Sequence, residues 1–269
     1  MSATSSLLSI AKRPVKEVLK RRMLAGEFSP TVTIGARDPR RAQVFMCLYN
    51  RPDRIHRVLE LLAGQSNVEG VDLHLWNNNR RDHAVYERAV RDFGSTGALR
   101  SVRLIRSPFN LGSIARFYPV RQLAASGYSG PIVVLDDDEE IRSDFLSRAL
   151  EEYDAEAITA WWAFEVNDAY WDRSPSRPGG RVDHIGPGGM VCSAALFLDD
   201  DFFTELPQKY WLLDDLWLTY FAKSRGLALR KLDVEIDFVL PETNQHHLNP
   251  LKDEFFRYLY PEGETDTTR

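Results

Sequence analysis

Between residues 43 and 135, short apolar runs alternate with segments whose apolar residues recur at helical spacing. The runs predict strands at 43–48, 71–76, 102–105 and 131–135, and the intervening segments predict helices at 54–63, 83–93 and 114–126. Strands that alternate with helices form a mainly parallel sheet with helices on both faces. The sequence therefore predicts an α/β fold.

The second half of the chain is less regular. Helices are predicted at 144–153 and 214–225, and strands at 157–164 and 191–198. Segment 172–189 carries three prolines and five glycines, which predicts a long loop able to cover a substrate. Residues 1–41, which end in a polar linker, predict a basic helical appendage, and 42–269 a single domain.

Five acids follow the predicted strand 131–135 directly, in the run VVLDDDEEI (133–141). Ligands bind beyond the carboxyl ends of strands in open α/β sheets, and alternate residues of an extended chain point the same way. Asp136 and Asp138 should therefore face one site, where two carboxylates repel each other unless a cation lies between them. Carboxylates suit Mg²⁺ or Mn²⁺, which also bind substrate phosphates. The alternative is a solvated turn with an acidic helix start at Glu139 and Glu140.

Composition excludes some classes of protein. The formal net charge of -5 argues against a general nucleic-acid binder. Cys47 and Cys192 both lie in apolar runs and are expected to be reduced thiols. No apolar run approaches the roughly 18 residues of a membrane span, and no long apolar core of a secretion signal is recognised. We therefore expect a cytoplasmic protein.

Segment 7–24, LLSIAKRPVKEVLKRRML, carries six basic residues and one acid, with apolar residues at helical spacing. It predicts a basic amphipathic helix. Two interpretations remain open. The helix binds an anionic membrane or a partner, which would place the protein at the inner membrane surface, or it is a solvated helix packed on the domain.

Polar motifs follow the predicted strands in a fixed order: YNR (49–51), LWNNN (75–79), SPFNLGSIARFYP (107–119), the acids, GGMVCSAALF (188–197) and LDDLW (213–217). Together, over residues 43–230, they resemble the nucleotide-sugar-dependent glycosyltransferases of the GT-A fold. Among these, the order and spacing are most similar to the exostosin-like family. The family 2 glycosyltransferases share the first half of the pattern and are the near alternative.

The resemblance assigns roles to individual positions. The donor-binding residues it implies are Tyr49, Arg51, Asn78, Asn110, Arg116, Asp136 and Asp137. Asp138 matches the acid that ligates the metal, and Asp215 matches the catalytic acid beside the reacting sugar, with Asp214 next to it at the helix start. His246 and His247 are candidates for a further metal ligand, the alternative being ordinary surface or core histidines.

The activity that the resemblance implies is transfer of a sugar from a UDP-sugar to a glycan or lipid-linked acceptor, with Mn²⁺ or Mg²⁺ as cofactor. It implies a hexosyl- or N-acetylhexosaminyltransferase of polysaccharide biosynthesis, with a nucleotide-binding half at 42–142 and an acceptor half at 143–269. The family's Thr-Gly-Ala-Ala reads CSAA (192–195) here, and its Glu-Asp reads Asp214-Asp215. No counterpart of its N-terminal membrane anchor is recognised. These departures leave the sugar, the acceptor and the retaining or inverting outcome open.

A chemical argument independent of the resemblance also supports a catalytic role for Asp215, because an acid beside the acceptor hydroxyl can take the proton of that hydroxyl. The alternative is that Asp214 and Asp215 only cap a helix.

Three competing functions remain. A non-catalytic carbohydrate or membrane-associated module could keep the same fold. A haloacid-dehalogenase-like phosphatase would need Thr or Val where Glu140 stands, and a sugar-nucleotide pyrophosphorylase would need a glycine-rich loop in place of YNR (49–51).

Overall fold

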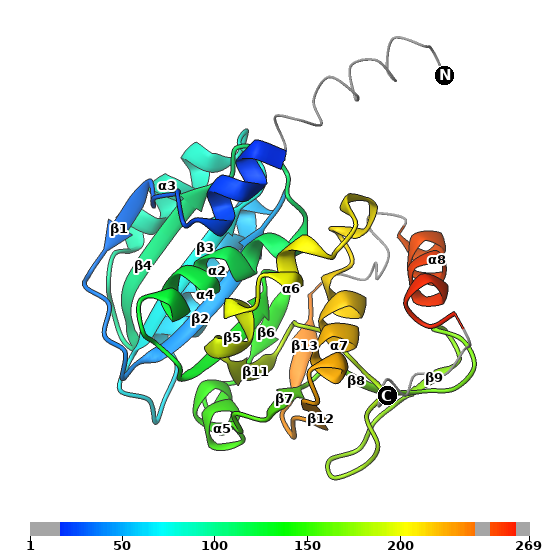
Figure 1. The fold of residues 1–269 in the computed structure, drawn as a ribbon. Coiled ribbons are helices and arrows are strands. Elements are labelled where there is room, and N and C mark those ends of the chain that lie inside the picture. Colours follow the sequence, from blue (N-terminus) through cyan, green and yellow to red (C-terminus); the bar gives the residue numbers. More distant parts are fainter. Residues whose placement is uncertain (1–16, 240–247, 262–269) are drawn as a thin grey trace.

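The computed structural model describes residues 17–239 and 248–261. Its centre is an eight-stranded sheet in the order β1-β4-β3-β2-β5-β11-β7-β12 (Figure 1). The four strands expected from the first half run parallel: β2 (Ala42–Leu48), β3 (Val71–Asn77), β4 (Leu99–Arg106) and β5 (Pro131–Asp136). The predicted α/β fold with a mainly parallel sheet is confirmed.

Helices cover both faces of this sheet, as expected (Figure 1). One apolar layer joins Val44 and Met46 of β2 to α2 (Ile55–Ala63), α3 (His83–Phe93) and α5 (Phe145–Glu151). The opposite layer joins Phe45 to α4 (Phe117–Ala125), α6 (Asp201–Thr204), α7 (Asp214–Ser224) and α8 (Asn249–Leu259). Successive strand residues point to opposite faces, so one continuously apolar strand contributes side chains to both apolar layers.

Short 3-10 helices lead into two of these helices. The first is η1 (Pro52–Arg54) before α2, and the second is η2 (Ser113–Arg116) before α4. Two others, η3 (Ala194–Leu198) and η4 (Gln208–Tyr210), lie before α6 and α7.

Two predicted strands of the second half are shorter than expected. The run 157–164 is interrupted after β7 (Ala157–Ala160), because the backbone at Trp161 and Trp162 bonds to Gly189 and Gly186, and β8 (Ala163–Val166) enters another sheet. The run 191–198 ends with β11 (Met190–Ser193), where the Ser193 hydroxyl accepts a hydrogen bond from Ala195 N and starts η3. Strand β11 is antiparallel to both neighbours, and β12 (Ala228–Lys231) forms the edge beside β7.

Segment 172–189 is not an irregular loop throughout. It contains β9 (Arg173–Pro175) and β10 (His184–Ile185), which pair with the two edges of β8. The alternative of a helix start at Glu139 and Glu140 is wrong. Both residues lie in β6 (Glu139–Ile141), which pairs with β13 (Ile236–Phe238).

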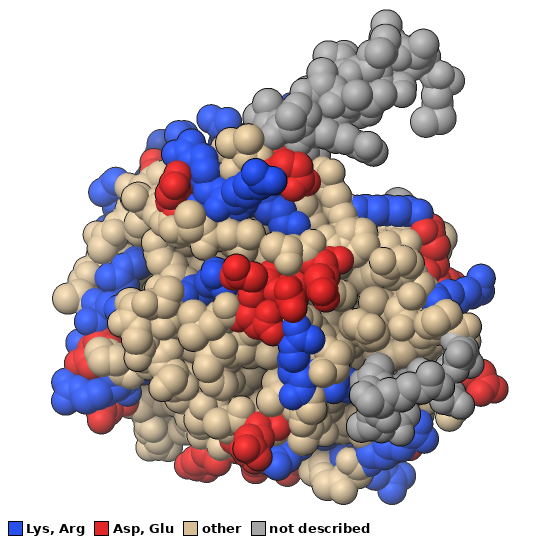
Figure 2. Space-filling view, in the orientation of Figure 1, with Lys and Arg blue, Asp and Glu red and all other residues tan. Residues whose placement is uncertain are grey.

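The described part of the N-terminal segment packs on the domain. A helix at 17–24 places Met23 in the core, and β1 (Val32–Ile34) pairs with β4 at the sheet edge. Figure 2 shows basic side chains around this helix and acidic ones over α6. Among the described helices, none is both long and apolar enough to cross a bilayer. Cys47 and Cys192 are free thiols, as expected.

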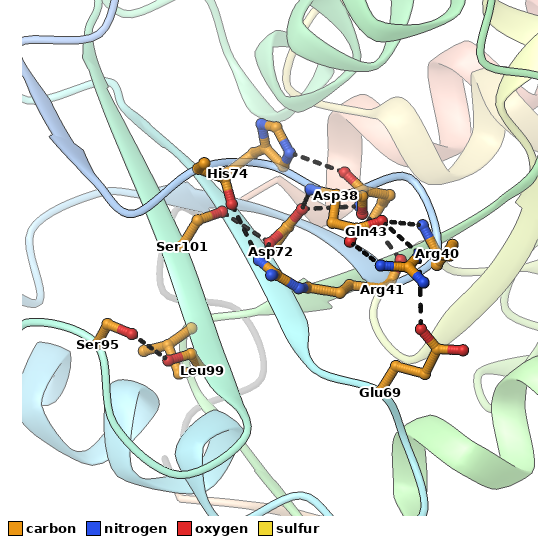
Figure 3. A network of polar contacts seen from close by, with 11 residues as sticks. Asp38, Arg40, Arg41, Gln43, Glu69, Asp72, His74, Ser95, Leu99 and Ser101 are labelled. Atoms are coloured by element: carbon orange, nitrogen blue, oxygen red, sulfur yellow. Dashed lines mark hydrogen bonds and ion pairs between the residues drawn. The ribbon is translucent and has the colours of Figure 1, made fainter.

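A buried carboxylate, Asp72, holds the linker before β2 against the sheet (Figure 3). It accepts hydrogen bonds from Asp38 N, from the Gln43 amide and from the Ser101 hydroxyl at 2.8–3.1 Å, with Arg41 at 3.3 Å. Four donors offset the cost of burying this charge. The network lies at the amino ends of β2 and β3, so it fixes the sheet from the end opposite to the predicted site.

Candidate functional site

A cleft of about 540 Å³ opens at the carboxyl end of β5. Its walls come from η2, the β5–β6 turn, β8, β9, β10 and the starts of α7 and α8. Six of the residues singled out from the sequence line it: Arg51, Arg116, Asp136, Asp138, Asp214 and Asp215.

Asp136 and Asp138 both face this cleft, although Asp138 lies in a turn rather than on the strand. Arg116 bonds Asp136 at 2.6 Å, and Arg51 lies 3.1 Å from Asp138. Burial, reinforced by the neighbouring Asp136 charge, raises the pKa of Asp138. A cation between the two carboxylates would relieve this cost.

Two further acids of the run, Asp137 and Glu139, face inward. Asp137 is buried against Arg51, and burial raises its pKa to about 6. Glu139 accepts a hydrogen bond from Asp136 N at 2.9 Å, and burial raises its pKa well above the usual range. Gly188 packs against Asp136 and Glu139, since a Cβ there would lie 2.7 Å from Asp136 Oδ2 and overlap Glu139 Oε1. Asp137 and Glu139 therefore shape the turn beneath the cleft and do not line it.

The donor set fits a divalent metal that shares its coordination with a substrate. Among the described residues, no group of three or more His, Cys, Asp or Glu side chains is arranged to hold a metal alone. Mg²⁺ and Mn²⁺ need no such cage, because they keep waters and often use one or two carboxylates together with phosphates. Asp136 and Asp138 supply two hard oxygen donors at one wall, which matches that pattern.

Arg116 joins the two halves of the site. It is 4% exposed, and besides Asp136 it lies 3.3 Å from Asp214 at the start of α7. Asp214 also accepts a hydrogen bond from the Ser113 hydroxyl at 2.6 Å. Burial raises the pKa of Asp214 to about 6 against the opposing charge of Arg116. One arginine thus fixes the end of β5 relative to the start of α7.

Asp215 belongs to a second cluster, which sequence motifs did not reveal. Lys252 of α8 donates to its Oδ2 at 2.6 Å, and the Tyr170 hydroxyl donates at 3.2 Å. His184 lies 3.9 Å away and stays neutral, because burial lowers its pKa to about 3. The helix-cap alternative is weakened, since Leu213 holds the N-cap position and Asp215 lies within the first turn.

The charge state of Asp215 follows from this pair. Burial alone would raise its pKa, but the Lys252 charge outweighs that effect and holds the pKa of Asp215 well below its usual range. The same contact holds the pKa of Lys252 above its usual range. Nothing in the sequence around Lys252 signals this role, because α7 and α8 meet only in the folded chain.

Besides Asp137, three predicted donor-binding residues lie outside the cleft lining. The Asn78 amide bonds Gly112 O at 2.8 Å and Leu111 N at 3.2 Å. Asn110 accepts from Gly112 N at 2.8 Å, so both amides support the loop before η2. Tyr49 follows β2 and is likewise absent from the lining. His246 and His247 lie outside the described residues.

Another part of the cleft lining is aromatic. It is formed by Trp162, Phe164, Tyr170, Trp171 and Phe238. Trp171 and Phe238 are about two-fifths exposed, so apolar ring faces remain open to a ligand.

Comparison with known proteins establishes the fold. No family model and no curated protein matches the chain. The structure of S. aureus TarS (residues 1–349) is 16% identical with a TM-score of 0.50, covering 72% of this chain and 58% of that one. Mannosyltransferase PcManGT from Pyrobaculum calidifontis, solved with GDP-Man and Mn²⁺, is 14% identical with a TM-score of 0.54, covering 99% of this chain and 81% of that one.

At such low identity the likeness concerns architecture. The protein has the GT-A type of α/β fold found in these glycosyltransferases, as the sequence predicted. The chain spans little more than half of the TarS structure. The exostosin-like family and family 2 remain predictions.

Proposed function

We propose that this protein is a glycosyltransferase that moves a sugar from a nucleoside diphosphate donor to a glycan or lipid-linked acceptor, with Mn²⁺ or Mg²⁺ as cofactor. One observation carries the proposal. Asp136 and Asp138 share a cleft at the end of β5 with Arg116 and Asp215. A parallel-sheet end with paired carboxylates, an arginine and a separate acid has the groups that diphosphate departure requires.

Each residue then has a distinct task. Asp136 and Asp138 would hold the metal, which when bound supplies positive charge to the departing diphosphate. Arg116, already fixed by two carboxylates, orients Asp136 and adds positive charge at the same wall. Asp215, held ionised by Lys252, would face the sugar or the acceptor hydroxyl.

The low pKa makes Asp215 a weaker proton acceptor than an unpaired aspartate. Its negative charge, in contrast, is present throughout the physiological pH range. Stabilising positive charge on the reacting sugar and orienting the acceptor hydroxyl are therefore roles that suit it. The Tyr170 hydroxyl, which donates to Asp215, helps to fix the carboxylate in position.

Two nucleosides remain candidates for the donor, uridine and guanosine. The resemblance to exostosin-like enzymes favours a UDP-sugar carrying a hexose or N-acetylhexosamine. The mannosyltransferase PcManGT was solved with GDP-Man and Mn²⁺, so a GDP-sugar is an equal candidate. The helix at 17–24 packs on the domain through Met23, while Arg21 and Arg22 stay exposed; these two arginines are available for a peripheral contact with an anionic membrane on the cytoplasmic side, where a lipid-linked acceptor would reside.

A non-catalytic binding module is the second candidate. The arginine partners of Asp136 and Asp138 favour it, because each carboxylate already has a counter-charge without a metal. The phosphatase and pyrophosphorylase alternatives gain no support from the two solved structures above.

Titration with nucleotide sugars tests the proposal. Donor affinity should be measured by calorimetry for several UDP- and GDP-sugars with and without Mn²⁺, in the wild type and in Asp138→Asn. We expect the wild type to bind one donor more tightly with Mn²⁺, and Asp138→Asn to lose this stimulation while its thermal unfolding is preserved. Asp168→Asn, at an exposed position outside the cleft, is the control. An Asp138→Asn variant with unchanged metal dependence would refute the metal assignment, and donor binding without turnover would favour the binding module.

A further inference from the structure

Arg173 of β9 lines the aromatic side of the cleft. Its guanidinium carbon lies 4.3 Å from the ring centre of Phe164, 4.4 Å from Tyr170 and 5.1 Å from Trp171. Within the described part of the chain, the guanidinium makes no hydrogen bond and no ion pair. Three rings therefore hold a cation whose five N–H donors have no hydrogen-bond partner among the described residues.

The other cations of the cleft are arranged differently. Arg51 is paired with Asp137 and Asp138, and Arg116 with Asp136 and Asp214. Lys252 is paired with Asp215. Among the described lining residues, Arg173 is thus the one fully charged side chain without a carboxylate partner. Among the described residues, no carboxylate compensates the positive charge of Arg173, whereas Asp136, Asp138 and Asp214 are each paired with an arginine.

Aromatic faces and an oxyanion satisfy different parts of a guanidinium. Ring faces attract the cation through the quadrupole but accept no strong in-plane hydrogen bonds. The planar fork of N–H groups matches a carboxylate or a phosphate in bidentate geometry. Rings that fix the side chain also lower the entropy lost when an anion binds.

We propose that the acceptor carries an anionic group, a carboxylate or a phosphate, and that Arg173 binds it. This inference rests on the proposed glycosyltransferase function and names the substrate class of its acceptor side. Lys252 does not compete for the anion, because Asp215 neutralises it, and His184 is uncharged. The acceptor is then oriented with its charge toward Arg173 and its neutral hydroxyl toward Asp215.

The test compares three probes that share a glucose-like ring: glucose, glucuronate and glucose 6-phosphate. Binding of each to the full chain is measured by ligand-observed NMR or calorimetry in the presence of UDP and Mn²⁺, so the readout does not depend on turnover. We expect the wild type to bind at least one charged probe about tenfold or more tightly than glucose, the order expected for hydrogen bonds between charged groups. Arg173→Gln should abolish this preference, and Arg173→Lys should keep only part of it, because a lysine lacks the fork.

Arg177→Gln is the matched control, since Arg177 is exposed in the same segment and does not line the cleft. It should behave as the wild type. A preference for glucuronate identifies a carboxylate, and a preference for glucose 6-phosphate identifies a phosphate.

Two results would overturn the proposal. One is that Arg173→Gln and the wild type bind the charged probes equally. The other is that Arg173→Gln weakens UDP binding as much as it weakens charged-probe binding, which would assign Arg173 to the donor diphosphate. Failure of the wild type to bind any nucleotide sugar would instead refute the proposed function, while the charged-probe comparison still reports on Arg173.

Discussion

At the scale of the residue, Asp215 combines two properties that rarely coincide. It is placed in a cleft, and its half-buried carboxylate lies 2.6 Å from Lys252, so its charge persists at physiological pH. A buried ion pair is weak evidence for stability, because the cost of desolvating both charges offsets their attraction. Its position in the cleft is the stronger argument for a role in the reaction.

Replacing Asp215 by Asn should reduce turnover far more than donor affinity. The carboxylate faces the reacting sugar or the acceptor, so its effect is largest in the transition state, and a loss of about 10²–10⁴-fold in kcat is expected. Steady-state kinetics on the identified donor measures it, with Asp168→Asn as the control. Near-wild-type turnover in Asp215→Asn would contradict a role in the reaction, and Asp215 would then be only a structural residue in the first turn of α7.

Replacing Lys252 by Met should raise the pKa of Asp215, because the Lys252 charge is what holds that pKa low. The acidic limb of the kcat/KM profile should then move to higher pH, and turnover at neutral pH should fall on the order of 10²-fold as the carboxylate loses its fixed position. Lys209→Met is the matched control, since it removes another lysine bonded to α8, at Glu254, without touching the cleft. An unshifted profile in Lys252→Met would show that Lys252 does not set the charge of Asp215.

At the scale of the element, segment 172–189 is short strands and turns attached to β8 (Figure 1). Its residues Arg173, His184 and Gly188 line the cleft, so it lies against the site that a donor and an acceptor would occupy. The residues between its short strands include prolines and glycines. Segments of short strands joined by such turns commonly belong to the less stable parts of a fold.

We predict that hydrogen exchange in 172–189 slows when UDP and Mn²⁺ are added. A bound ligand would contact this segment and suppress its local opening. The amides of β2 and β3, which are buried in the main sheet, provide the internal control and should be unaffected. Equal exchange of 172–189 with and without ligand would exclude a lid.

At the scale of the whole molecule, the sheet separates two polar regions. The carboxyl end of β5 carries the cleft, and the amino ends of β2 and β3 carry the Asp72 network (Figure 3). His74, two residues further along β3, stacks on Phe45 with ring centres 4.4 Å apart and contacts Gln43. These buried groups link the stability of the entire fold to pH.

Replacing His74 by Phe should change how stability depends on pH. Burial lowers the pKa of His74 to about 3 from 6.5, so below pH 6.5 the unfolded chain binds a proton that the folded chain does not. Each pH unit in that window removes about 1.4 kcal/mol from the free energy of unfolding. The phenyl ring introduced by His74→Phe keeps the stack and does not titrate.

The stability of the wild type relative to His74→Phe should therefore fall by about 2 kcal/mol between pH 7 and pH 5. Urea unfolding at the two pH values measures this difference, and the contributions of other titrating groups cancel in it. His56→Phe, at an exposed site, is the control and should show no such change. A difference that stays constant would mean that His74 titrates alike in both states.

The sequence alone was sufficient for the first four strands of the parallel sheet, their helices and the position of the acids. The periodicity of apolar side chains is a local property of the sequence. Because β2 to β5 are buried on both faces, each appears in the sequence as a continuous apolar run and can be recognised as a strand. The carboxyl ends of parallel strands lie at the same edge of a sheet, where ligands bind. The end of the strand at Asp136 therefore identified the binding edge from the sequence.

The tertiary structure alone decided which side chains complete the cleft. Lys252 comes from α8 and reaches Asp215, 37 residues earlier in the chain, through packing that no local pattern encodes. Arg173 is close in sequence to Tyr170 and Trp171, and the pairing of β9 with β8 brings it over Phe164 as well. Asn78 turns inward and the exposed Asn110 bonds its own loop, because the backbone N–H groups of the buried residues Leu111 and Gly112 need partners and the two amides supply them. Local patterns specify elements and their ends, whereas the satisfaction of buried charges and polar groups depends on which distant segments meet.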